Sequence, residues 1–223
     1  MTTSSGPVMQ LLASGLQLWV RQQCDAIESL EIQLEGSALG LLRGKLAGVR
    51  LMARRVSYQQ LELELVQLTT SPIEVNIGKL LKGQPLQLQQ PFTIQGQVGF
   101  TAEGLTQSMG KPQWRGLADH LGETLLGISP VVELRISHDK LIFAAKAAGE
   151  VGLVELETHL QASDGSVVIN ASAGELLVEL PMDPGITIER ANLEGGMVQL
   201  YGTAKVSVGA SQPESGATRG SPG

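Results

Sequence analysis

The sequence has 223 residues, long enough for one large domain or two small ones to bury a stable core. A single cysteine, Cys24, excludes an internal disulfide, and no run approaches the ~20 apolar residues that a membrane-spanning helix needs. The net charge of −6 and the aromatic content of 3% argue against nucleic acid, whose binding depends on basic and aromatic side chains.

The N-terminal half predicts one helix followed by strands. From Val8 to Cys24, apolar residues recur at spacings of three and four, which indicates an amphipathic helix. Residues 27–36, 46–60 and 61–70 alternate apolar and polar side chains, as strands with one wet face do. We expect the last two to form an antiparallel pair. Residues 91–100 predict another strand, bent by its two glycines.

Two helices and a strand-rich half follow. Thr101 is the predicted N-cap of a helix that ends at residue 109. A second amphipathic helix is predicted over 111–127, with Pro112 at its first position. From Val131 to Val208 short strands alternate with turn residues, which predicts an antiparallel meander. The fold class expected from these elements is α+β.

No linker divides the chain, so we expect a single domain over residues 8–208. Residues 1–7 and 209–223 are small, polar or rich in Gly, Ser and Pro, which predicts disordered ends. The N-terminus carries no positive charge before its apolar stretch, so it is a poor signal peptide. We therefore expect a cytoplasmic protein, with the inner face of a membrane as the surface that it could meet.

The sequence contains no recognisable catalytic motif. Its histidines, His120, His138 and His159, fall in different elements and lack metal-ligand spacing. Glycine-rich phosphate loops and nucleophile elbows are missing from the sequence. We therefore predict no catalytic residue, no metal and no cofactor. An enzyme that acts on a lipid remains the third functional alternative.

Several packing motifs occur in a fixed order between Glu31 and Leu105. The Gly/Leu-rich segment GSALGLLRGK leads into V-x-L-x-A-x-x-V, and a paired strand ends in TSPI. A further strand begins at Pro91 and continues into TAEGL. In these features the chain resembles the bacterial LmeA-like phospholipid-binding family. The resemblance implies phospholipid binding. It also implies a fold similar to the tubular lipid-binding superfamily, in which a curved antiparallel sheet wraps a long N-terminal helix and a second amphipathic helix.

Composition and resemblance favour a non-enzymatic protein that binds phospholipid or fatty acyl lipid in an apolar groove. Aliphatic side chains dominate the 42% hydrophobic content and match aliphatic ligands. The predicted groove is lined by Leu12, Leu16, Val49, Leu51, Leu63 and Leu65. Ordinary core packing is the alternative for these residues. The alternative function is an interaction or assembly scaffold, in which the same groove holds a partner helix or a second copy of the chain.

Charge is strongly polarised along the chain. Between Gly36 and Leu61 there are five basic residues and no acidic one, whereas the rest carries 11 basic against 22 acidic residues. The basic residues are Arg43, Lys45, Arg50, Arg54 and Arg55. We predict that this segment docks on an anionic membrane surface. The alternative is that these residues pair with Glu62, Glu64 and other acids of neighbouring strands.

Overall fold

The computed structural model describes residues 7–37, 39–40, 43–74, 90–149, 151–172, 174 and 176–207. Within these ranges, three helices accompany strands whose pairings are all antiparallel. The helices are α1 (Pro7–Gln23), α4 (Ala102–Met109) and α5 (Arg115–Leu126). This combination confirms the mostly antiparallel α+β architecture. The expectations for the chain ends before Pro7 and after residue 207, and for the link over 75–89, lie outside the described residues.

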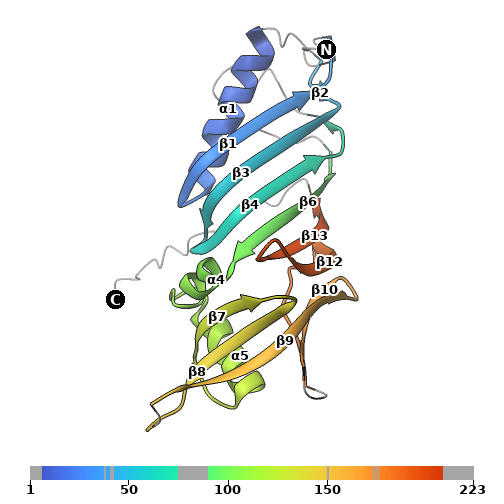
Figure 1. Ribbon diagram of the computed structural model, residues 1–223. Helices are drawn as coiled ribbons and strands as arrows, with labels where there is room; N and C mark the ends of the chain where they lie inside the picture. The colour runs from blue at the N-terminus through green and yellow to red at the C-terminus, as the bar shows by residue number, and fades with distance from the viewer. Residues whose placement is uncertain are drawn as a thin grey trace, which may run out of the picture.

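The largest sheet has six strands in the order β1-β3-β4-β6-β13-β12, so the end of the chain joins strands from its beginning (Figure 1). Its strands are β1 (Ala26–Glu35), β3 (Gly48–Tyr58), β4 (Leu61–Thr70), β6 (Phe92–Thr101), β13 (Met197–Val206) and β12 (Ile186–Glu194). A two-stranded sheet pairs β2 (Lys45–Leu46) with β5 (Ile73–Glu74).

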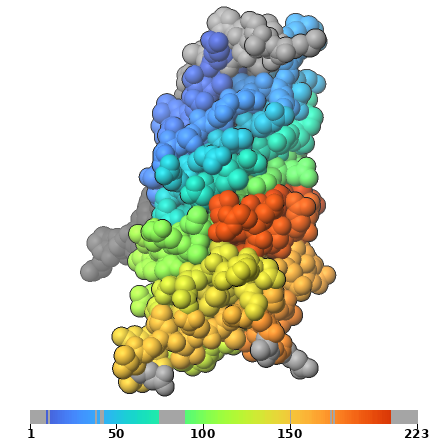
Figure 2. Space-filling model, viewed as in Figure 1, coloured from blue at the N-terminus to red at the C-terminus, as the bar shows by residue number. Residues whose placement is uncertain are grey.

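A second sheet of five strands has the order β11-β10-β9-β8-β7. Its strands are β7 (Val131–Ser137), β8 (Lys140–Lys146), β9 (Leu153–Ser163), β10 (Ser166–Ala171) and β11 (Leu177–Glu179). The predicted meander is therefore divided between two sheets, because β13 pairs with β6 and β12 pairs with β13. Figure 2 shows the resulting elongated molecule, with the red β12–β13 band between the strands of the first half and those of the second sheet.

Helix α1 lies beside the edge strand β1 and covers the nearest part of the large sheet (Figure 1). Its Leu12 is buried against Ile32 and Val49, while Leu16 and Val20 pack at the rim of the same cluster. We call this group, completed by Leu46 and Ile73, the α1 cluster. Each fully buried aliphatic side chain contributes about 1.5–3 kcal/mol, so this cluster is sufficient to hold the helix on the sheet.

A second cluster joins the other two helices to both larger sheets. Leu121 and Leu125 of α5 are buried with Phe100 of the large sheet and Phe143 of the five-stranded sheet. We call this the central cluster.

Helix α5 begins at Arg115 rather than at the predicted Pro112, because residues 111–114 form a turn. The Trp114 indole of that turn donates to the Gln59 carbonyl over 2.9 Å.

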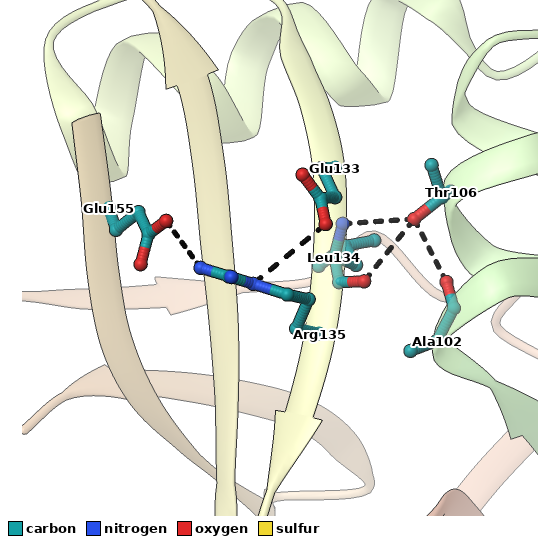
Figure 3. Close-up of polar contacts among 6 residues, drawn as sticks. All are labelled: Ala102, Thr106, Glu133, Leu134, Arg135 and Glu155. Carbon is teal, nitrogen blue, oxygen red and sulfur yellow. Dashed lines mark hydrogen bonds and ion pairs between the residues drawn. The ribbon is translucent and has the colours of Figure 1, made fainter. Parts of the chain in front are cut away.

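Helix α4 connects the two larger sheets through two hydroxyl groups. Its predicted N-cap is confirmed, since Thr101 Oγ1 accepts from Gly104 N. Ser108 Oγ accepts the Glu62 N–H of β4 over 2.9 Å. Thr106 Oγ1 accepts the Leu134 N–H of β7 over 2.9 Å and donates to Ala102 O, also over 2.9 Å (Figure 3). The helix thereby gives hydrogen-bond partners to backbone N–H groups of β4 and of the edge strand β7.

The Thr106 bond predicts a measurable stability effect. Thr106→Val keeps the shape of the side chain but leaves the N–H of Leu134, a 3% exposed residue, without its acceptor. We expect the free energy of unfolding to fall by about 1–3 kcal/mol in urea denaturation. Thr187→Val, at an exposed position on β12, is the matched control and should change it by less than about 0.5 kcal/mol. Equal effects of the two substitutions would contradict this role of Thr106.

Candidate functional site

The register of the six-stranded sheet assigns its side chains to two chemically different faces. Residues directly opposite one another in adjacent antiparallel strands lie on the same face. Two continuous rows of small or apolar residues cross all six strands on one of these faces. They are Ile32, Leu51, Leu68, Gly96, Gly202, Ile188 and Leu30, Ala53, Val66, Val98, Leu200, Ala191. We call this the apolar face; α1 packs against its β1 end.

The opposite face carries polar rows through the same strands. One row is Glu31, Met52, Gln67, Gln97, Tyr201, Arg190, and its neighbour is Gln33, Arg50, Thr69, Gln95, Thr203, Thr187. Amide, hydroxyl and guanidinium groups predominate in these rows. We call this the polar face. The sheet therefore separates two chemical environments across its own thickness.

The middle of the apolar face is only half buried. Val66, Leu68, Ile94 and Ala204 are of intermediate exposure and belong to neither the α1 cluster nor the central cluster. Leu51, also of intermediate exposure, connects them to the α1 cluster. These five residues form what we call the mid-sheet strip. Aliphatic surface that is partly accessible between two packed clusters is suited to aliphatic groups of a ligand.

A pair of glycines allows a close approach of strand backbones beside this strip. Gly96 and Gly202 face each other across β6 and β13. A Cβ atom on Gly96 would lie 2.3 Å from Gln67 O, and one on Gly202 would lie 2.3 Å from Thr187 O. Only glycine fits this close approach of backbones. On the polar face the two glycines line a hollow of about 660 Å³.

The polar hollow extends from β3 to β12. Arg50 lies on the β3 side and Arg190 on the β12 side, with Gln67, Gln97 and Tyr201 between them. Across four strand spacings of ~4.8 Å, the two arginine backbones are about 19 Å apart. The two arginines therefore stand at opposite sides of the hollow. The volume of the hollow, about 660 Å³, lies within the range of about 300–1,000 Å³ typical of small-molecule sites.

The predicted groove residues fall into three places. Leu12, Leu16, Val49 and Leu51 come together in and around the α1 cluster. Leu63 packs against the central cluster. Leu65 lies opposite Arg54 and Gly99, in the register of the polar face. The structure therefore brings four of the six together and separates Leu63 and Leu65 from them.

The predicted basic residues lie in β3, in β2 and in the turn before β2. Lys45 pairs with Glu74 at 3.0 Å, Arg50 with Glu35 at 2.7 Å and Arg55 with Glu28 at 2.6 Å. The acids in these pairs come from β1 and β5, and they are among the other acids of neighbouring strands that the alternative named beside Glu62 and Glu64. Arg43 and Arg54 are exposed and have no ion pair with any described residue.

Among the described residues, the two groups with shifted pKa values are Cys24, between α1 and β1, and Lys140 of β8, and they do not form an acid–base pair. Burial raises the pKa of the Cys24 thiol, and the nearby Asp25 carboxylate adds to this effect. A hydrogen bond from Lys140 to Glu157 raises the pKa of that lysine. The described ranges contain no cluster of three potential metal ligands and no helix long and apolar enough to cross a membrane.

Comparison with known proteins assigns the family. Residues 4–203 match the model of the LmeA-like phospholipid-binding family. The match covers most of the chain, so the protein belongs to this family, as the motifs between Glu31 and Leu105 predicted. No curated protein and no solved structure matches the chain.

The close backbone approach at Gly202 makes a direct prediction. Gly202→Ala places a methyl group against the Thr187 backbone, so the strands must separate or shift. We expect a loss of about 1–3 kcal/mol in the free energy of unfolding, measured by urea denaturation. Gly152→Ala, where an added Cβ would have no atom within 4 Å, should change it little. A Gly202→Ala variant as stable as the native protein would show that the two backbones are not in close approach.

Proposed function

We propose that the protein is a non-enzymatic phospholipid-binding protein whose apolar face holds acyl chains. The observation that carries the proposal is the half-buried mid-sheet strip in a member of a phospholipid-binding family. Each methylene moved from water onto such a surface contributes about 0.8 kcal/mol. A micromolar Kd corresponds to about 8 kcal/mol, so contact with about ten methylenes along Leu51, Val66, Leu68 and Ile94 supplies the required free energy.

In this proposal α1 and the apolar face form the cradle of a tubular lipid-binding-like fold. Leu16 and Leu51 contact the acyl chain at the α1 end, and Leu12 and Val49 support them from the core. The buried state of Leu12 and Val49, which are 9% and 8% exposed, favours this supporting role. Leu63 and Leu65 lie outside the strip, and their contact with lipid stays a prediction from the sequence. The scaffold alternative places a partner helix on the same strip.

The face assignment is tested by two neighbouring residues of β4. Val66→Gln puts a polar group into the strip, whereas Leu65→Gln makes a comparable change on the opposite face. Loss of about two methylene contacts, at ~0.8 kcal/mol each, weakens binding of a fluorescent fatty-acyl probe about tenfold or more. We expect this loss for Val66→Gln and nearly native affinity for Leu65→Gln, with folding checked by circular dichroism.

The opposite result, a loss confined to Leu65→Gln, would support the groove predicted from the sequence and reject the mid-sheet strip. A native protein that takes up no acyl probe, and yields no lipid on solvent extraction and mass spectrometry, would favour the scaffold alternative. The two β4 variants thus test where the lipid binds, and probe uptake with solvent extraction tests whether it binds at all.

Docking on an anionic membrane completes the proposal. Three of the five basic residues have carboxylate partners, so we assign the docking charge to Arg43 and Arg54. The native protein should float with anionic vesicles at low salt and lose this binding near 1 M salt, where the Debye length falls to ~3 Å. The double variant Arg43→Gln/Arg54→Gln should float less. If the folded native protein fails to float at low salt, the docking idea is wrong.

A further inference from the structure

The polar hollow holds a row of side chains that acyl-chain binding on the other face does not use. Two of its lining residues, Gln97 and Tyr201, are held from beneath by buried Gln199, which is 8% exposed and does not itself line the hollow. The Gln199 Oε1 atom accepts the Tyr201 hydroxyl over 2.6 Å and the Gln97 side-chain amide over 3.3 Å. Both neighbours are therefore fixed in orientation. The remaining amide and hydroxyl capacity of Gln97 and Tyr201 is available to the hollow that they line.

Arg190 reaches this hollow because of a local irregularity in β12. The register between β12 and β13 shifts between Ile188 and Arg190, so Glu189 is an extra residue. Without this bulge, Arg190 would share the face of Ile188, since side chains two residues apart lie on the same side of a strand. The bulge instead pairs Arg190 with Tyr201 on the polar face. Redirecting one side chain in this way is a recognised use of β-bulges near functional sites.

The arginine is then held over the aromatic ring. The Arg190 guanidinium carbon lies 3.9 Å from the Tyr201 ring centroid, and Tyr201 is fixed by Gln199. A guanidinium stacked on a ring keeps its in-plane N–H groups free to donate. Arg190 has no ion pair with any described residue. Arg50, on the opposite side, donates through Nη2 to Glu35 and has further N–H groups.

The charge of the lining limits the ligand. Two arginines and one acid, Glu189, line the hollow, and Glu35 stands beside Arg50. The lining alone sums to +1, so it suits a ligand with a single negative charge rather than a multiply charged one. Planar guanidinium groups match phosphate oxygens, and the glutamine amides between them match hydroxyl groups. A phosphodiester that carries hydroxyls combines both requirements.

The geometry points to a second ligand site in the polar hollow, which binds a monoanionic, hydroxyl-bearing phosphodiester between Arg190 and Arg50. This chemistry occurs both in lipid headgroups and in free glycerol phosphodiesters. The site lies on the opposite face of the sheet from the mid-sheet strip. Leu51 and Leu68 of the strip also border the hollow, whereas Arg190, Gln97 and Tyr201 belong to the polar face alone, so a change at Arg190 leaves the strip intact.

The test uses glycerophosphoglycerol, which has the phosphodiester and hydroxyls without acyl chains. Titration of the labelled full chain, followed by NMR, should shift the signals of residues 95–97 and 201–202. Arg190→Gln should weaken the apparent affinity about tenfold, while Arg190→Lys, which keeps the charge but loses the fork, should fall between the two. Arg135→Gln, an exposed arginine of the five-stranded sheet that pairs with Glu155, is the matched control and should bind as the native protein does.

A second arm identifies the source of the phosphodiester. Vesicles of phosphatidylglycerol that displace the probe would assign the site to a lipid headgroup, and failure to displace it would assign the site to a free phosphodiester. Uptake of the fatty-acyl probe should be unchanged in Arg190→Gln, which separates this site from the mid-sheet strip. The inference is overturned if the native protein gives no shifts in the hollow, or if folded Arg190→Gln binds the phosphodiester as tightly as the native chain.

Discussion

The hydrogen-bonded register of the six-stranded sheet decides which side chains meet, and both candidate sites depend on it. Because side chains alternate along a strand, a slip of one residue would transfer every side chain to the other face. The observed pairing places Leu68 beside Leu51 and Gln67 beside Met52. The α1 cluster then fixes the register at the β1 edge, since Leu12 packs against Ile32 and Val49.

The two faces are coupled at Gly96 and Gly202. Their missing side chains leave the middle of the apolar face without volume at these positions, where an added Cβ would meet the neighbouring backbone. The two glycines also form part of the lining of the hollow on the polar face. The Glu189 bulge on the next strand places Arg190 on the polar face, in the lining of the same hollow. Local irregularities of the backbone, rather than loops, therefore shape the surface of this sheet.

Elements with strong local signals were predictable from the sequence. The long N-terminal helix, the β3–β4 pair and the Thr101 cap follow from periodicity and side-chain chemistry, and the family follows from packing motifs. The joining of β13 to β6 was not predictable, because long-range pairing leaves no periodic trace. Leu65 was grouped with Leu51 by its apolar character alone. Only the register shows that it lies opposite Arg54.

One sequence feature indicates the polar hollow, namely the glutamines of β4 and β6. Gln67, Gln95 and Gln97 occupy alternate positions of β4 and β6, where a solvent-facing strand more often carries charged residues. The contribution of Arg190 could not be read in this way, because its face depends on the Glu189 bulge. Pattern reasoning assumes regular alternation, and it fails where a bulge adds a residue.

The assignment of acyl chains to the apolar face is tested most directly by photo-crosslinking. A phospholipid with a diazirine at the end of one acyl chain is bound to the full chain and irradiated, and the adducts are mapped by peptide mass spectrometry. The account predicts adducts on the mid-sheet strip, at Leu51, Val66, Leu68 and Ile94. Adducts concentrated on Gln67, Gln97 and Tyr201 of the polar face would contradict it.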